Sequence, residues 1–264
     1  MTHTGKPGGQ RAIWSGDALR APHAQADKAT RVEAMFDAIA PTYELVNTLG
    51  SVGRDAAWRR RAVVLAGAGP EDVVLDICCG TGDMLRAFAR SAPTASLLLG
   101  IDFAAGMLAH ASLDEVDVPV HLVRADALRL PVADQAVDAI TCAFGVRNLA
   151  DVQRGLEEMY RVMRPGGRVV ILEFAMPEHP VWRAFYRFYV GRLLPLLATL
   201  VKRDREGAYR YLARSIRTFE TAASMARRLE DAGFAHVEMW RMNLGGVVIY
   251  RGVKPDATRC SKPL

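Results

Sequence analysis

Two glycines and two acids in the first half of the chain have the spacing of a cofactor site. Residues 73–83 read Val-Val-Leu-Asp-Ile-Cys-Cys-Gly-Thr-Gly-Asp, which predicts a buried strand, a tight turn at Gly80 and Gly82, and the start of a helix. A glycine turn lets backbone N–H groups approach a ligand closely. Asp102 ends the next apolar run, twenty residues past Gly82, where a carboxylate can bind a ribose diol. The pattern predicts a nucleoside-bearing cofactor, with a plain strand–helix turn that binds nothing as the alternative.

The details of the turn favour S-adenosylmethionine over a dinucleotide. A dinucleotide fingerprint needs a third glycine three residues after the second, and Leu85 stands at that position. Asp76, four residues before Gly80, is not part of that fingerprint either. A carboxylate beside the turn suits S-adenosylmethionine, because this cofactor carries a sulfonium and an ammonium group.

Alternating strand and helix patterns must position these residues. Such alternation predicts an α/β fold with a parallel sheet and helices on both faces, whose ligands bind at the carboxyl ends of the strands. Asp76, Asp102, Asp126 and the loop 143–148 all fall at such ends. The expected strands are 72–77, 97–102, 120–125, 138–143 and 168–173, and the expected helices are 83–91, 104–113, 151–163 and 219–233. Segments 236–241 and 246–251 are expected to form an antiparallel terminal pair.

Composition places the chain among globular proteins of one ordinary domain. Half of its 264 residues are hydrophobic. Its four cysteines form no C-x-x-C pair and have no histidine at metal spacing, which argues against a zinc site and fits a reducing cytoplasm. Residues 1–30 are polar and lack the apolar core of a signal peptide, so we expect a disordered tail there. The domain is then expected over 31–254, with a second tail at 255–264.

The order of these motifs resembles that of the class I S-adenosylmethionine-dependent methyltransferases. Residues 144–148 (Phe-Gly-Val-Arg-Asn) look like a loop of the ubiquinone/menaquinone-biosynthesis C-methyltransferases. The resemblance to that family covers roughly 31–254. Further matching stretches are 43–47, 161–167, 172–174, 209–212, 215–217 and 251–252.

Some positions depart from the family pattern, and others indicate a branch of it. Glu44 and Asp55 replace an Asp and a His of that pattern. The pair Cys78-Cys79, together with Asp102 followed by Phe103, resembles the menaquinone branch more than the ubiquinone branch. Demethylmenaquinol is therefore the expected acceptor. Methylation in the ubiquinone pathway and a non-catalytic cofactor-binding scaffold remain alternatives.

The resemblance implies methyl transfer to a ring carbon of a reduced, prenylated quinol. Arg147 would stabilise the phenolate that activates this carbon or order a water that takes its proton, and Asn148 would orient the quinol. Tyr211 and Arg217 are candidates for the wall of the substrate site, and no metal is expected. The residues expected to hold S-adenosylmethionine are Asp76, Gly80, Thr81, Gly82, Asp102, Asp126 and Ala127.

A basic and aromatic segment over 181–217 has a composition that indicates a lipid substrate. It holds nine Lys or Arg against two acids, a net charge of +7, while the whole chain has +5. Its apolar run is shorter than the roughly 18 residues of a membrane span, so it favours a membrane interface or a lid over a prenyl tail. We expect a cytoplasmic protein, peripheral on the inner face of the membrane, with a homo-oligomer or quinone-biosynthesis partners possible. Nucleic-acid methylation is disfavoured because the charges are interspersed with long apolar side chains.

Overall fold

A seven-stranded sheet forms the centre of the computed structural model, which describes residues 12–91, 95–114, 116–193 and 207–256. The strand order is β3-β2-β1-β4-β5-β7-β6. Strands β1 to β5 are parallel, and β7 pairs antiparallel with both β5 and β6. The strands are β1 Val73–Ile77, β2 Leu97–Asp102, β3 Val120–Arg124, β4 Val137–Ala143, β5 Met163–Phe174, β6 Ala235–Met242 and β7 Val247–Val253. The predicted parallel sheet with a terminal antiparallel pair is confirmed.

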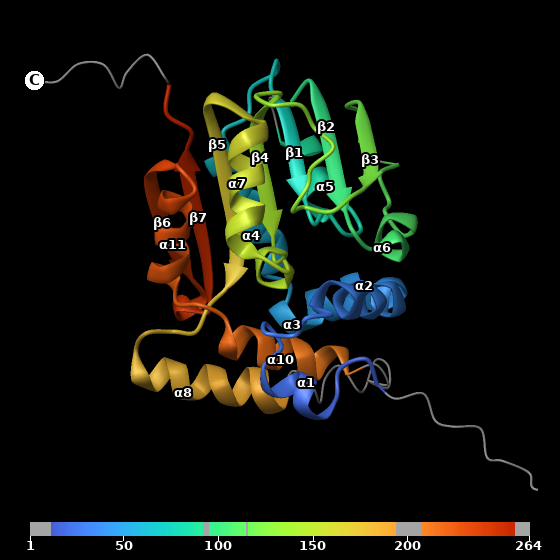
Figure 1. Ribbon diagram of the computed structural model, residues 1–264, viewed down its shortest axis with the longest axis vertical. Coiled ribbons are helices and arrows are strands. Elements are labelled where there is room, and N and C mark those ends of the chain that lie inside the picture. Colours follow the sequence, from blue (N-terminus) through green and yellow to red (C-terminus); the bar gives the residue numbers. More distant parts are fainter. Residues whose placement is uncertain (1–11, 92–94, 115, 194–206, 257–264) are drawn as a thin grey trace, which may run out of the picture.

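Helices cover both faces of the sheet, as the alternating pattern predicted (Figure 1). One face packs against α4 (Asp55–Ala66) and α5 (Asp83–Ala89) through buried residues that include Leu85 and Phe88. The other face packs against α7 (Val152–Val162) and α11 (Ala222–Asp231) through residues that include Met159 and Met225. The short helix α6 (Ala105–Ala109) follows β2. Burying apolar side chains on both faces explains why the central strands are almost continuously hydrophobic.

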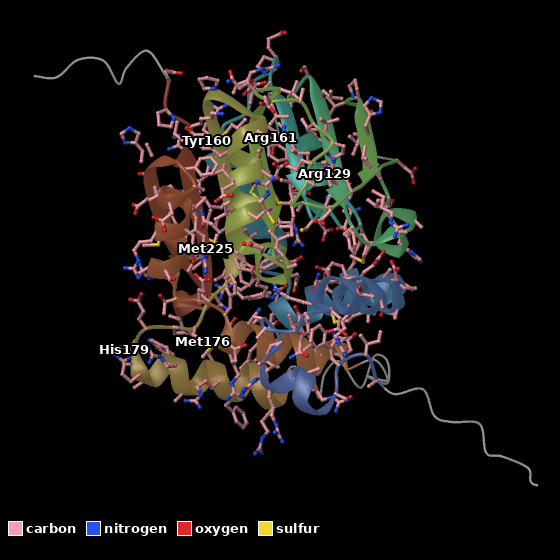
Figure 2. All side chains as sticks on the ribbon, viewed as in Figure 1. Arg129, Tyr160, Arg161, Met176, His179 and Met225 are labelled. Atoms are coloured by element: carbon pink, nitrogen blue, oxygen red, sulfur yellow. The ribbon has the colours of Figure 1, made fainter. Side chains whose placement is uncertain are left out.

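A further layer of helices lies across the carboxyl ends of the parallel strands (Figure 1). Figure 2 shows Met176 and His179 at this end, where β5 leads into α8, while Tyr160 and Arg161 lie at the opposite end. The helical elements of this layer are α1 Gly16–Arg20, α2 Lys28–Ile39, η1 Ala40–Thr42, α3 Tyr43–Ser51, α8 Pro180–Phe188, η3 Tyr189–Leu193 and α10 Ala208–Thr218. The layer therefore draws on both the N-terminal and the C-terminal half of the chain.

The N-terminal segment differs from the disordered tail expected over 1–30. Residues 1–11 lie outside the described part, but residues 12–30 are described, with α1 and the start of α2 among them, and Trp14 is fully buried. The Trp14 ring stacks on Tyr211 with 4.2 Å between centroids, and Arg31 donates a 2.6 Å hydrogen bond to the Ile13 carbonyl. One tryptophan buried against a distant helix produces no local periodicity. The polar composition of this segment therefore suggested disorder where the structure has helices.

The basic segment 181–217 is described in part. It contains α8, η3 and α10, whereas residues 194–206 lie outside the described residues, as do 257–264 of the expected C-terminal tail. Within the described ranges, none of the helices has the length and hydropathy needed to cross a bilayer.

Candidate active site

The glycine turn after β1 has a backbone that favours glycine. Gly80 and Gly82 have φ angles of +56° and +89°, in the left-handed region that L side chains rarely adopt. A Cβ atom on Gly80 would lie 3.1 Å from Cε of Met107, and one on Gly82 would lie 2.9 Å from Cδ2 of Leu113. The turn therefore has the tight conformation that the sequence predicted, and it also packs closely against neighbouring side chains.

Asp102 ties this turn to the end of β2. Its carboxylate accepts hydrogen bonds from the backbone N–H of Gly80, at 2.8 Å, and of Ala104, at 2.9 Å. Burial raises its pKa above the ordinary value, although these backbone hydrogen bonds counteract the rise. A carboxylate held in this way has lone pairs left for a further donor, so the side chain can fix the turn and still receive a hydroxyl.

A cavity of about 90 Å³ opens in front of the turn, and we call it the strand-end cavity. Five residues expected from the sequence line it: Gly80, Asp102, Asp126, Ala127 and Asn148. Helix α2 covers it from outside with Ala29, Val32, Glu33 and Phe36. The remaining lining residues are Tyr43, Cys78, Phe103, Ala104, Met107, Ala143, Phe144, Gly145, Leu149 and Ala150.

Three residues of the expected cofactor set lie outside that lining. Asp76 is 1% exposed and accepts a 2.6 Å hydrogen bond from the hydroxyl of Thr141, its partner across β1 and β4. Burial raises the pKa of Asp76 to about 7. Thr81 is buried, and Gly82 precedes α5. These three residues belong to the strand and the turn but do not line the strand-end cavity.

Arg147 is a buried cation at the end of β4, in the turn η2 (Val146–Asn148). Its Nη1 donates to Oε1 of Glu173 at 2.7 Å and to the Phe144 carbonyl at 2.6 Å. Its backbone N–H donates to Oε2 of Glu173 at 3.2 Å, and the guanidinium lies 5.4 Å from the centre of the Phe174 ring. Burial by itself would lower the pKa of Arg147, but the Glu173 carboxylate raises it overall. Arg147 therefore stays charged.

Asn148, the next residue of this loop, forms a hydrogen bond with Tyr211. The Tyr211 hydroxyl donates to Oδ1 of Asn148 at 2.9 Å, and Nδ2 of Asn148 donates to the Phe144 carbonyl at 3.3 Å. Burial raises the pKa of Tyr211, so its hydroxyl remains a donor. Arg217 is exposed on the last turn of α10 and lines none of the three cavities described in this section. The structure thus brings Tyr211 to the loop and leaves Arg217 away from it.

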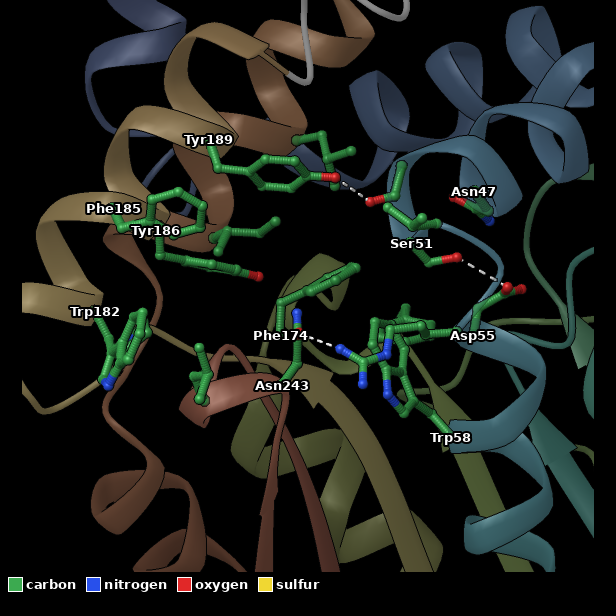
Figure 3. Close-up of a pocket in the computed structure, with 18 of the residues that line it drawn as sticks. Asn47, Ser51, Asp55, Trp58, Phe174, Trp182, Phe185, Tyr186, Tyr189 and Asn243 are labelled. Atoms are coloured by element: carbon green, nitrogen blue, oxygen red, sulfur yellow. Dashed lines mark hydrogen bonds between the residues drawn. The ribbon is translucent and has the colours of Figure 1, made fainter.

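A much larger cavity of about 540 Å³, the aromatic cavity, lies between the helical layer and the sheet (Figure 3). Figure 3 shows Trp182, Phe185, Tyr186 and Tyr189 on one side of it and Trp58 on the other. Its polar groups are mostly paired, because Ser51 donates to Asp55 at 2.9 Å and Arg54 to Asn243 at 3.3 Å. It is also lined by Asn47, Gly50, Val52, Arg59, Phe144, Phe174, Pro177, Leu212, Ile216 and Leu244.

Phe144 stands where the cavities meet. It lines the strand-end cavity, the aromatic cavity and a third, buried cavity of about 40 Å³ whose wall includes Arg147, Tyr211 and Tyr43. Its φ of +59° is unusual for a residue other than glycine, and such strain is concentrated at functional sites. A ligand in the strand-end cavity and one in the aromatic cavity would therefore face each other beside Arg147.

Sequence reasoning assigned no role to several residues that build this site. Phe144 and Glu173 lie inside motifs quoted in the sequence analysis, but roles were assigned only to other residues of those motifs. Tyr43 lines two of the cavities. Arg59 pairs with Asp55 at 2.7 Å and Asp83 at 2.9 Å, so it links the wall of the aromatic cavity to α5. Such contacts join segments that are distant in the sequence, so the spacing of residues along the chain does not predict them.

Comparison with known proteins identifies the family. The model of the ubiE/COQ5 methyltransferase family matches residues 24–254. The chain belongs to this methyltransferase family. A demethylmenaquinone methyltransferase of Mycobacterium sp. (strain JLS) is 43% identical over 225 residues, covering 85% of this chain and 94% of the relative. One of Thermus thermophilus is 42% identical over 223 residues, covering 84% and 100%. A ubiquinone/menaquinone biosynthesis C-methyltransferase of Geotalea daltonii is 35% identical, covering 86% and 98%.

Solved structures share the fold of this family member at low sequence identity. A putative methyltransferase of Haloferax volcanii, in complex with its Trm112 activator, has a TM-score of 0.60 and 19% identity, covering 84% of this chain and 98% of the other. An S-adenosylmethionine-dependent methyltransferase of Thermotoga maritima has a TM-score of 0.58 and 17% identity, covering 84% and 99%. The predicted class I S-adenosylmethionine-dependent methyltransferase fold is confirmed.

Proposed function

We propose that this protein transfers a methyl group from S-adenosylmethionine to a ring carbon of demethylmenaquinol in menaquinone biosynthesis. The observation that carries the proposal is the arrangement around Phe144, which lines the strand-end cavity, the aromatic cavity and the small third cavity whose wall includes the buried Arg147. Relatives of 43% and 42% identity that are named demethylmenaquinone methyltransferases support the choice of acceptor.

The strand-end cavity has the donors and acceptors that S-adenosylmethionine requires. Gly80 has no side chain to fill the cavity wall, and the Asp102 carboxylate at the end of β2 suits the ribose hydroxyls. Asp126 and Ala127 follow β3 and would meet the adenine. Asp76, Thr81 and Gly82 would act from beneath by holding the turn in place. When bound, this cofactor supplies an electrophilic methyl group.

The aromatic cavity suits the other half of the reaction. A prenylated naphthoquinol is mostly apolar, and burying its tail against aromatic side chains is favourable at about 25 cal/mol per Å² of apolar surface. The walls contributed by Trp58, Phe174 and Tyr186 are continuous with the junction at Phe144. The ring would lie at that junction, with the prenyl tail extending toward α8.

Arg147 would stabilise the oxygen that activates the ring carbon. Its Nε–H is buried and has no hydrogen-bond partner among the described residues, so it is a donor available to a phenolate. A guanidinium is too basic to act as the general base, and its contribution is to favour the oxyanion once the quinol hydroxyl loses its proton. Asn148, held by Tyr211, would orient the ring for in-line attack, where positioning supplies several kcal/mol of the barrier.

Helix α8 supports a peripheral position on the cytoplasmic face of the membrane. Four of its apolar side chains are exposed to solvent: Val181 by 64%, Trp182 by 40%, Phe185 by 60% and Phe188 by 59%. Trp182 and Phe185 also line the aromatic cavity, so its wall is continuous with this exposed face. The exposed Arg187 and Arg192 suit anionic lipid headgroups. A prenyl tail could then pass from the bilayer into the cavity without crossing water.

A direct assay tests the proposal. Purified protein is given S-adenosylmethionine labelled in its methyl group. The acceptor is demethylmenaquinol or the corresponding ubiquinone-pathway precursor, carried in lipid vesicles and kept reduced. We expect label in menaquinol. Label in the ubiquinone precursor alone would move the chain to the other branch. Cofactor binding without transfer to either quinol would favour a non-catalytic scaffold. Flotation with anionic and neutral vesicles, compared with a Phe185→Ser/Phe188→Ser variant, tests the membrane contact.

A further inference from the structure

Lys28 is a buried cation that contacts the backbone of the Arg147 loop. It is the first residue of α2 and only 3% exposed. Its Nζ donates to the carbonyl oxygen of Arg147 at 3.0 Å and to that of Leu149 at 2.5 Å. The side chain thus joins the N-terminal helix, which covers the strand-end cavity, to the two carbonyls on either side of Asn148.

The charge of Lys28 has no acidic partner. Arg147 is matched by Glu173, whereas no carboxylate among the described residues lies within ion-pair distance of Lys28. The other charged or titratable groups that interact with it are Arg147 itself and His23. Burial first and Arg147 second lower the pKa of Lys28 to about 8. Within the group of Lys28, Arg147 and Glu173, protonated Lys28 therefore adds a positive charge that Glu173 does not pair.

A purely structural link between α2 and the loop would not need that charge. Burying an ammonium without a carboxylate costs several kcal/mol, and an amide or hydroxyl could donate to the same carbonyls at a smaller cost. A cation beside Arg147 does what a neutral donor cannot, because it favours negative charge at the place where the quinol oxygen would ionise.

We propose that Lys28 is a positioning residue of the methyl transfer. It holds the carbonyls of Arg147 and Leu149 so that the guanidinium and Asn148 face the junction of the cavities. It also supplies the positive charge that the Arg147–Glu173 pair lacks. This inference rests on the proposed function in its electrostatic part, while the loop-holding part concerns the protein alone.

Titration of Lys28 should make turnover depend on pH, in the direction opposite to the effect of quinol ionisation. Ionisation of a quinol hydroxyl would make turnover rise with pH. Loss of the Lys28 proton near pH 8 removes both the charge and one hydrogen-bond donor, so turnover should fall above about pH 8. A lysine replaced by arginine keeps its charge throughout this range.

The test compares Lys28→Met, Lys28→Gln and Lys28→Arg in the full-length protein. Arg31→Met is the matched control, because Arg31 lies one turn further along α2 and donates to the carbonyl of Ile13 instead of to the loop. Each variant is first checked for an unchanged thermal unfolding profile, and Lys28→Gln serves if Lys28→Met does not fold. Turnover, the KM of each substrate, the profile from pH 6.5 to 9.5 and amide hydrogen exchange over 145–149 are then measured.

We expect the neutral variants to lose kcat by about 10- to 100-fold, as for a hydrogen bond to a charged group, with the cofactor KM almost unchanged. Exchange over 145–149 should accelerate. Lys28→Arg should restore most of kcat and move the decline above pH 8 to higher pH.

Normal kcat in Lys28→Met, or a decline that persists in Lys28→Arg, would overturn the charge role. Unchanged exchange would overturn the loop-holding role. Absence of transfer by the wild type would refute the proposed function, and the exchange data would still decide whether Lys28 holds the loop.

Discussion

The strand-end cavity and the aromatic cavity are built in different ways. The first depends on backbone features, namely the positive φ of Gly80, the ends of parallel strands and a carboxylate bonded to main-chain N–H groups, with side chains of α2 as its cover. The second is set mainly by apolar side chains from α4, α8, α10 and the turn η4 (Asn243–Gly245), which lie far apart in the sequence. The comparison teaches that backbone geometry defines the proposed donor site, whereas the packing of separate helices defines the proposed acceptor site.

Arg147 lies between the two regions, and its replacement should give the largest effect. Arg147→Lys keeps a positive charge for Glu173 but loses the planar fork and its Nε donor. We expect kcat to fall by about 100- to 1,000-fold, the range found when an oxyanion donor is removed, while cofactor affinity changes little. Steady-state kinetics and calorimetric titration with S-adenosylmethionine measure the two quantities.

Arg154→Lys is the control for that prediction, because Arg154 forms an ion pair with Glu158 on α7 and lines none of the three cavities. Equal losses of turnover and cofactor affinity in Arg147→Lys would contradict the role at the junction. Such a result would mean that the Arg147 loop belongs to the cofactor site as a whole.

The backbone character of the cofactor site is tested by Gly80→Ala. The added Cβ would press on Met107 at 3.1 Å and impose strain at a φ of +56°. We expect cofactor affinity to fall by about 30- to 100-fold, which corresponds to a loss of roughly 2–3 kcal/mol. Binding of a quinol analogue should hardly change.

Gly67→Ala is an unusually well matched control. Gly67 ends α4 with a φ of +57°, and the nearest atom to its added Cβ is 3.8 Å away. Both variants should lose about 1 kcal/mol of folding free energy from backbone strain, but only Gly80→Ala should weaken the cofactor. Comparable binding losses in both would show that the effect is global and not a property of the turn.

The same contrast explains what could be predicted from sequence. The sheet, its helices and the positions of Gly80, Asp102 and Asp126 followed from hydrophobic periodicity and turn chemistry, which are local signals. Arg147 and Asn148 were found through the motif that contains them. Helix ends were displaced by a few residues, as with α6, which was expected over 104–113 and spans Ala105–Ala109.

The remaining parts of the site depend on contacts between distant segments. Trp14 and Tyr211 are 197 residues apart in the sequence yet stack on each other, and no local pattern links them. Lys28 lay within the segment expected to be a disordered tail. Glu173 was visible only as part of a strand, because the identity of its partner depends on how β5 lies beside the end of β4.

Asp76 gives a pH-dependent test of the cofactor side. Its pKa is about 7 in the folded protein and near 3.8 when unfolded. The unfolded chain therefore loses this proton first, and stability should fall as the pH rises from about 4 to about 7. Asp76→Asn cannot titrate but can still accept from Thr141. Its unfolding free energy relative to wild type should improve by about 2 kcal/mol between pH 5 and pH 7. Urea unfolding at several pH values measures this difference, and parallel curves for the two proteins would contradict it.

The acceptor side should respond to a change of volume that leaves the cofactor site untouched. Leu212 lines both the aromatic and the buried cavity, and Leu212→Trp would fill part of the space assigned to the prenylated ring. We expect the KM for a long-chain demethylmenaquinol to rise by about 10-fold, or roughly 1.4 kcal/mol, with cofactor affinity within twofold of wild type. Ala223→Trp is the control, because Ala223 is exposed on α11 and lines none of the cavities described above. Kinetics with long-chain and short-chain acceptors separate two possibilities. A larger penalty for the long chain would place the tail in this cavity, and an equal penalty for both would restrict the role of Leu212 to the ring. A loss of cofactor binding as large as the rise in KM would remove the distinction between a donor site set by backbone and an acceptor site set by packing.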